Sequence, residues 1–174
     1  MVQYARPDAD TSVGNWTASS GTDRYAMIDE ASTDDSDYIQ VTDSGGGAEA
    51  ITVSLSGVTD PSSGADHSVV VRYGEDSGMD AVTLNVNLKD SSTSIKNQDF
   101  SGSSTTNHTM TLSTAQANNI SGYGNLTLVL TATDGSMSGS TSKIYQAYFA
   151  CPDAASSSVP IAAIAMNTFR QMRG

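Results

Sequence analysis

The stretch AVTLNVNLK, residues 81–89, decides the fold class, because apolar and polar side chains alternate along its whole length. The apolar side chains occupy every second position, at Val82, Leu84, Val86 and Leu88. A β-strand points successive side chains to opposite faces, so one face of this segment is aliphatic and the other is polar. The pattern predicts a half-buried antiparallel strand that lies inside a sheet, packed on one side and exposed to water on the other.

Other segments repeat this alternation and are expected to pack against the first. Residues 51–55, 69–73 and 126–132 each place aliphatic side chains at every second position. Turn-forming clusters separate eight or more short strands at intervals of roughly 8–15 residues. The chain is therefore predicted to be all-β, an antiparallel β-sandwich with jelly-roll-like connections in which these aliphatic faces meet.

Helical structure is expected only in short turns. Residues 24–31 are predicted to form one helical turn with Asp23 as its cap, and residues 113–120 a short helix capped by Ser113 or Thr114. Trp16, the single tryptophan, is expected to pack in the core or at its rim.

The pattern divides the chain into three parts. Residues 1–151 are predicted to form the sandwich, with residues 1–12 as an irregular N-terminal arm, and residues 152–158 are a linker rich in Ala and Ser. Residues 159–174 are predicted to be an apolar arm or helix, since Pro160 suits a first helical position. An isolated helix of this length is marginal in water, so the segment is expected to dock on its own sandwich or on another subunit. The residues predicted to bind a partner are Pro160, Ile161, Ile164, Met166, Phe169 and Met172.

Charge and cysteine content exclude several classes of protein. The 174 residues carry a formal net charge of -11 without a basic stripe, which argues against nucleic acid and favours solubility or a basic partner. No run of about 20 apolar residues occurs, so no membrane span is expected. Cys151 is the single cysteine and the N-terminus does not resemble a signal peptide, which favours synthesis and assembly in a reducing cytoplasm.

The residues that could carry chemistry do not form a recognisable catalytic set. His67 and His108 are the only histidines, and both are expected to lie on the surface at the starts of strands. Motifs for a nucleophile or a phosphate loop are missing, and the acids fall in turns where solvated carboxylates are expected. The sequence therefore predicts neither an enzyme nor a cofactor. Asp34, Asp35 and Asp37 form a candidate calcium site, although their spacing differs from that of an EF-hand.

Several stretches between residues 6 and 133 together resemble uncharacterised virion proteins of tailed bacteriophages. Residues 6–17 are similar to that family's opening RP…D-x-S-x-G-x-W, residues 25–31 to its Y-x-x-I-D-E segment and residues 34–39 to its DD-x-D-Y-I segment. Residues 60–73 and 112–128 resemble its later strands and helix. Thr33 stands where the family has a proline, and residues 71–75 lack its basic character. The resemblance implies a β-sandwich component of the virion and supplies no catalytic residues.

The expected function is accordingly that of a structural component of a bacteriophage virion. A capsid decoration or minor head protein is expected first, and a neck or tail-associated protein is the alternative. Its expected partners are capsid subunits and further copies of itself. An alternative of another class is a carbohydrate-binding module, for which the candidate aromatic residues are Trp16, Tyr38, Tyr73, Tyr123, Tyr145 and Tyr148.

Overall fold

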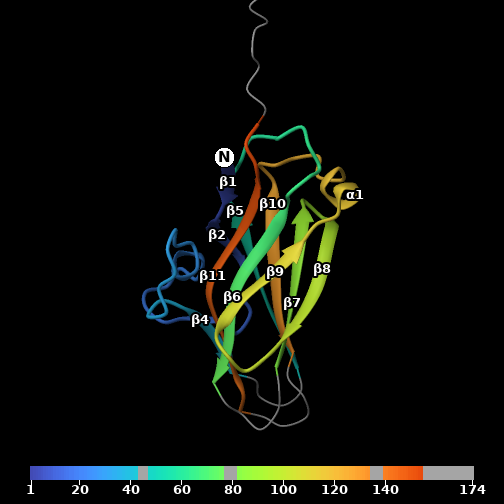
Figure 1. Ribbon diagram of the computed structural model, residues 1–174. Helices are drawn as coiled ribbons and strands as arrows, with labels where there is room; N and C mark the ends of the chain where they lie inside the picture. Colours follow the sequence, from blue (N-terminus) through green and yellow to red (C-terminus); the bar gives the residue numbers. More distant parts are fainter. Residues whose placement is uncertain (43–46, 77–81, 134–138, 155–174) are drawn as a thin grey trace, which may run out of the picture.

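Two antiparallel sheets packed face to face form the molecule, as the computed structural model shows (Figure 1). The structure describes residues 1–42, 47–76, 82–133 and 139–154. The first sheet has the strand order β3-β4-β11-β6-β9, and β1 also pairs with β11; the second has the order β2-β5-β10-β7-β8. The strands of the first sheet are β1 (Val2–Ala5), β3 (Thr17–Ala18), β4 (Ile39–Thr42), β6 (Ser68–Asp76), β9 (Thr106–Thr111) and β11 (Thr141–Pro152). Those of the second are β2 (Pro7–Ser12), β5 (Ala48–Leu55), β7 (Thr83–Asp90), β8 (Thr93–Ser101) and β10 (Leu126–Thr133).

The strands from β4 to β11 have jelly-roll connectivity. The chain passes between the sheets so that β4, β6, β9 and β11 lie in one sheet while β5, β7, β8 and β10 lie in the other. The spatial orders 4-11-6-9 and 5-10-7-8 are those of the two interlocked Greek keys of a jelly roll. The predicted fold class, an antiparallel jelly-roll sandwich, is confirmed.

The strand with the clearest alternation takes the predicted place inside a sheet. β7 lies between β10 and β8, and its residues Leu84, Val86 and Leu88 are fully buried. Leu88 pairs with Leu128 and Val86 with Leu130 in the neighbouring strand β10. The inward faces of β5 and β6 are buried as well, so the predicted aliphatic faces form the core between the sheets.

The N-terminal segment differs from the prediction of an irregular arm. Residues 2–5 form β1, which pairs with the end of β11, and residues 7–12 form β2, which pairs with β5 in the other sheet. β2 has the polar sequence PDADTS and its register with β5 shifts twice. An edge strand of this kind is mostly exposed and tolerates proline and bulges, so it has no alternating apolar pattern that could be recognised.

Both predicted helical segments exist but are shorter. η1 (Tyr25–Met27) is a 3-10 turn whose backbone donors, the N–H groups of Arg24 and Tyr25, bond to the carboxylate of Asp10, each at 2.8 Å. Asp10, and not Asp23, therefore caps the turn. α1 (Thr114–Ala117) begins after Ser113, which forms the expected cap together with Gln116. No helix in the described ranges is long and apolar enough to cross a membrane.

Of the two histidines expected on the surface, His67 is buried and His108 is half-buried. His67 is 0% exposed; its Nδ1 donates to the carbonyl of Ala65 at 2.7 Å, and its Nε2 accepts from the hydroxyl of Tyr123 at 2.8 Å. The ring of His108 contacts that of Phe100 in a tilted arrangement, and its Nε2 is buried. Burial lowers the pKa of this imidazole. Trp16 is buried as expected, and its Nε1 donates to the carbonyl of Glu49.

The end of the described chain extends the last strand beyond its expected end. β11 includes Cys151 and Pro152, so Pro152, which was assigned to the linker, is paired with Val2 of β1. The predicted partner-binding residues lie outside the described residues; they are Pro160, Ile161, Ile164, Met166, Phe169 and Met172.

Candidate functional site

The outer face of the first sheet carries a row of polar side chains at the level of the β11 bulge. Arg72 of β6 is paired in register with Asn107 of β9 on one side and with Gln146 of β11 on the other. Strand alternation directs the neighbouring residues Val71 and Ala147 into the core, so the three polar side chains share the outer face.

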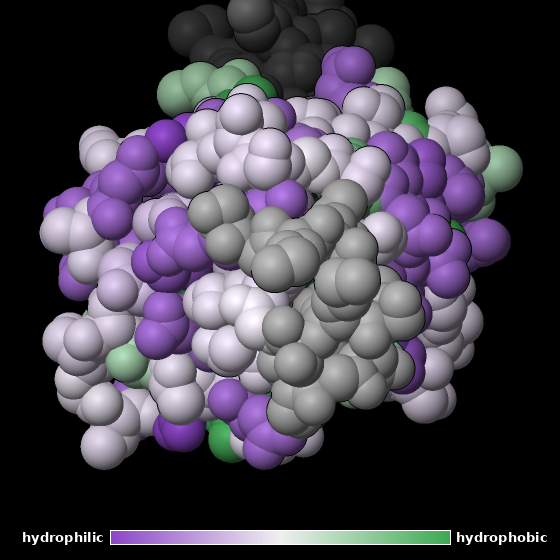
Figure 2. Space-filling model, turned by 90° about the horizontal axis from the view of Figure 1, so that it is seen from below, coloured by the Kyte–Doolittle hydropathy of each residue, from purple (hydrophilic) through white to green (hydrophobic). Residues whose placement is uncertain are grey.

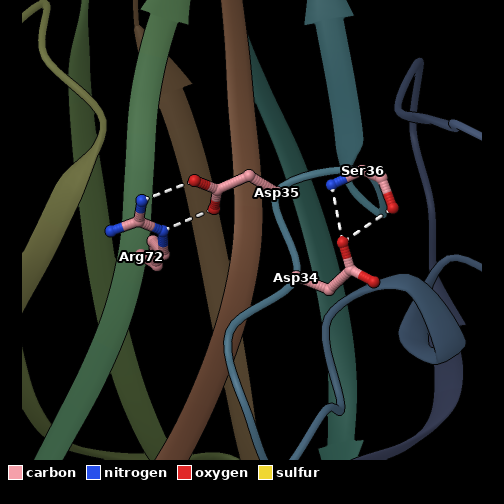
Figure 3. Close-up of polar contacts among 4 residues, drawn as sticks. All are labelled: Asp34, Asp35, Ser36 and Arg72. Carbon is pink, nitrogen blue, oxygen red and sulfur yellow. Dashed lines mark hydrogen bonds and ion pairs between the residues drawn. The ribbon is translucent and has the colours of Figure 1, made fainter.

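Residues 28–35, which follow η1, cross this row and are hydrogen-bonded to it at both ends. At one end the backbone N–H of Ala147 donates to the carbonyl of Ile28 at 2.9 Å. The carbonyl of Glu30 then accepts from Arg6 Nη1 at 2.6 Å and from Gln146 Nε2 at 2.7 Å. At the other end the carboxylate of Asp35 accepts two hydrogen bonds from Arg72, each 2.6 Å long (Figure 3).

A polar hollow of about 310 Å³ lies between these anchors and β1. Its loop wall consists of residues 31–33, which are held between the anchors at Glu30 and Asp35. Its lining residues come from four separate parts of the chain; they are Tyr4, Arg6, Ala31, Ser32, Thr33, Asn107, Gln146 and Tyr148. We call this the Arg6 hollow.

Two tyrosines hold the guanidinium of Arg6 at one side of the hollow. The rings of Tyr4 and Tyr148 meet edge to face with their centroids 5.5 Å apart. The guanidinium carbon of Arg6 lies 5.4 Å from the centroid of each ring, within the range of a cation–π contact. Of the ion pairs among the described residues, none includes Arg6. The positive charge of Arg6 is therefore stabilised by the rings of Tyr4 and Tyr148 and by the carbonyl of Glu30, without a carboxylate among the described residues.

Glu30 has a carboxylate whose surroundings disfavour its charge. Both carboxylate oxygens are buried, and within the described ranges neither has a hydrogen-bond partner of good geometry. Burial raises the pKa of Glu30 to about 7, and the negative charges of Asp29, Asp37 and Asp34 add to this rise, while an interaction with its own backbone N–H opposes it. The expectation that the acids are solvated is therefore wrong for Glu30.

A second acid, Asp90, is also buried, but it is fully hydrogen-bonded. One of its oxygens accepts from the N–H and hydroxyl of Ser121 and from the N–H of Gly122 at 2.7–3.0 Å. Burial opposes ionisation of Asp90, yet these hydrogen bonds prevail and lower its pKa. The carboxylate joins the end of β7 to the connection between α1 and β10 and has a structural role.

The structure does not bring the candidate calcium ligands together. Asp34 accepts from the backbone N–H of Ser36 at 2.9 Å and from its hydroxyl at 2.7 Å, and Asp35 turns the other way to Arg72 (Figure 3). These hydrogen bonds lower the pKa of both aspartates. In the described part of the chain, no three His, Cys, Asp or Glu side chains, Asp37 included, are grouped so that they could hold a metal ion.

The aromatic candidates separate into core and surface residues. Trp16 and Tyr73 are buried in the core, and Tyr123 is buried except for 8% of its surface. Tyr38 is half-buried on the outer face, and Tyr145, which is 9% exposed, lies beside it with the ring centroids 5.7 Å apart. Among the residues expected from the sequence, Tyr148 alone lines the Arg6 hollow.

The other lining residues were missed by sequence reasoning, although a weak signal exists. Tyr4 and Arg6, and likewise Gln146 and Tyr148, are spaced two residues apart. In an extended chain this spacing places both members of a pair on one face. It does not indicate that the two pairs meet across neighbouring strands, nor that Asn107 joins them.

The chemistry of the hollow is that of binding. The lining offers two aromatic rings, a guanidinium, two amides and hydroxyl groups, and it includes no carboxylate, imidazole or thiol side chain. Such a set lacks a general base and an activated nucleophile. Cys151 lies elsewhere, inside the sandwich, and burial raises the pKa of its thiol to about 11.

Comparison with known proteins gives a distant structural likeness and no match in sequence. No protein family and no curated protein matches the sequence. Among solved structures, the fold is similar to that of TmCBM61 in complex with beta-1,4-galactotriose, with a TM-score of 0.45 and 8% sequence identity. The match covers 85% of this chain and 86% of that chain.

Proposed function

We propose that this chain is a non-catalytic structural subunit of a bacteriophage virion, a capsid decoration or minor head protein. The resemblance of residues 6–133 to virion proteins of tailed phages motivates the proposal. In this account the jelly roll is a rigid body that presents polar faces to solvent, and the apolar residues beyond β11 attach it to capsid subunits. Oligomerisation with further copies would bury additional surface.

The distribution of exposed apolar residues is the observation that supports this proposal most. The large apolar side chains exposed in the described residues are Met1, Val2 and Tyr4, all at β1. β1 pairs with the end of β11, where Val2 lies opposite Pro152. The sandwich thus exposes its apolar side chains at the place from which the chain continues into the apolar residues 159–174. Exposed apolar groups gathered at one place are typical of an interaction site.

The opposite end of the sandwich has a different character. Viewed from that end, the described surface is mainly hydrophilic or neutral, and hydrophobic colour is confined to small separate areas (Figure 2). A subunit attached by the end that carries β1 would direct this polar surface outward, as a decoration protein requires.

Deletion of residues 159–174 tests the proposal. We expect the shortened chain to remain soluble and to unfold cooperatively, because the described core is closed by the two sheets. We expect it to be lost from phage particles, as measured by mass spectrometry of purified virions. A matched full-length control replaces Ser156, Ser157 and Ser158 with glycine and should be incorporated normally. Normal incorporation of the shortened chain would contradict the docking role, and its unfolding would assign the segment to the sandwich itself.

The Arg6 hollow favours a second candidate function, that of a carbohydrate-binding module. Exposed aromatic rings beside amide and guanidinium groups suit a sugar, which offers both C–H faces and paired hydroxyls. Binding of the isolated chain to a glycan array would support this function. A blank array would refute it and leave the structural role unaffected.

A further inference from the structure

We propose that the Arg6 hollow binds an acidic saccharide, with the guanidinium of Arg6 pairing with a carboxylate of the sugar. This inference rests on the second candidate function, carbohydrate binding, and it assigns Tyr4 to a ligand instead of to the docking end of a virion subunit. It specifies the class of ligand and gives each lining group a task.

The charge of Arg6 is the main reason to expect an anionic ligand. In a chain of net charge -11, this arginine has no acidic partner among the described residues. The Nη1 atom of Arg6 donates to the carbonyl of Glu30. Among the described residues, the other N–H groups of the guanidinium have no hydrogen-bond acceptor. A guanidinium presents donors in a planar fork that matches the two oxygens of a carboxylate.

The acids nearest to the hollow do not compete for Arg6. The lining contains no carboxylate, and Asp35 is engaged in its two hydrogen bonds with Arg72. Asp35 is therefore paired with Arg72, and Arg6 is the one charged side chain among the described residues that line the hollow. A carboxylate brought by a ligand would complete a pair that the protein itself does not form.

The two tyrosines supply an apolar corner for the sugar ring. Tyr4 is 49% exposed, and its ring stands at 82° to that of Tyr148. A pyranose can lay its C–H face on one ring while its edge contacts the other. The contact of Arg6 with both rings fixes the position of the carboxylate relative to this corner.

Neutral polar groups line the other side of the hollow, where sugar hydroxyls would lie. Asn107 offers an amide, and Ser32 and Thr33 offer hydroxyls from the anchored loop. Gln146 uses its amide nitrogen on the carbonyl of Glu30, which leaves its amide oxygen as an acceptor. A volume of about 310 Å³ is at the lower end of the range for ligand pockets and suits roughly one or two sugar rings.

A glycan array with matched acidic and neutral members tests the assignment, using the full chain as the probe. In each pair the acidic member carries a carboxylate where the neutral member has a hydroxymethyl group, as cellobiouronate does relative to cellobiose. The array also includes sialic acids. We expect retention of carboxylated glycans, with at least tenfold weaker retention of their neutral counterparts. Arg6→Gln should abolish this preference, and Tyr4→Ala and Asn107→Ala should each weaken binding at least fivefold.

Matched controls separate binding from folding. Arg24 also donates to backbone carbonyls, those of Trp16 and Thr22, but lies outside the hollow, so Arg24→Gln should bind normally. Tyr38→Ala removes an outer-face tyrosine that does not line the hollow and should bind normally too. Circular dichroism checks that each variant is folded. Asn107 is exposed on the edge strand β9, so Asn107→Ala keeps the test decisive if Arg6→Gln fails to fold.

The outcomes distinguish this inference from the function on which it rests. Retention of neutral glycans alone, or a carboxylate preference that survives Arg6→Gln, would overturn the inference and leave carbohydrate binding intact. Preference for sulfated over carboxylated glycans would overturn the carboxylate assignment. An array without any retained glycan would refute the inference and the carbohydrate-binding function together.

Discussion

Replacing Glu30 with glutamine should stabilise the protein at alkaline pH and leave it nearly unchanged in acid. The carboxylate of Glu30 is buried without a good hydrogen-bond partner in the described residues, and its pKa is raised from its ordinary value of 4.5 to about 7. The folded state therefore retains the proton over a pH range in which the unfolded chain has lost it. The free energy of unfolding must fall as the pH rises from 4.5 to 7, and the full penalty applies above pH 7.

The size of the effect follows from the pKa difference. Each unit of pKa difference is worth about 1.36 kcal/mol, so a rise from 4.5 to about 7 sets a ceiling of about 3.4 kcal/mol above pH 7. Glu30 is only partly buried as a residue, and solvent screening reduces the expected penalty to about 1–2 kcal/mol. Glutamine remains neutral at every pH and should recover this amount at pH 8.

Urea unfolding at pH 4.5 and pH 8 measures the effect directly. Trp16 is the single tryptophan and is 1% exposed, so its fluorescence reports global unfolding. A Glu30→Gln variant without extra stability at pH 8, or with the same gain at pH 4.5, would refute the reasoning.

Four further substitutions test three contacts that fix the fold and the loop. Arg72→Ala and Asp35→Ala, combined in a double-mutant cycle, should give a coupling energy of only about 0.5–1 kcal/mol because the ion pair is exposed. Each substitution should nevertheless speed hydrogen exchange at residues 31–35. Unchanged exchange would mean that the pair does not anchor the loop. Asp90→Ala should lower the free energy of unfolding by about 2–3 kcal/mol near neutral pH, through loss of hydrogen bonds to a charged group. The pKa of Asp90 in the folded state is lowered, so the difference in unfolding free energy between wild type and Asp90→Ala should shrink as the pH falls below 3.8. Urea unfolding at several pH values measures it. A difference that stayed constant would contradict the role given to the charged carboxylate. Tyr123→Phe leaves the buried His67 Nε2 without its donor and should cost about 1–2 kcal/mol in thermal unfolding, whereas no loss would mean that the bond is not formed in solution.

The sandwich could be predicted from the sequence because its inner strands are buried on one face. In β5, β7 and β10 the burial alternates residue by residue, and the apolar pattern alternates with it. β1 and β2 escaped prediction because they lie at sheet edges, where few side chains are buried and little apolar pattern is required. His67 was misplaced since its partner Tyr123 lies 56 residues away in the sequence.

The Arg6 hollow could not be predicted because it exists only after the sheets have formed. Its lining combines β1, the loop after η1, β9 and β11, so no local spacing records it. Sequence reasoning found Tyr148 as an aromatic candidate but could not indicate which arginine it would meet. The acidic run at residues 34–37 suggested a metal site, whereas in the fold one aspartate turns toward Arg72 of β6 and another toward Ser36.

Imaging of intact phage particles tests the central claim, the structural role in the virion, most directly. A cryo-EM reconstruction of particles that carry this gene should show a jelly-roll density at regular positions on the head, with the end that bears β1 toward the shell. Particles produced without the protein should lack this density and keep the rest of the head. Complete particles from which the chain is absent, as judged by both density and mass spectrometry, would contradict the account.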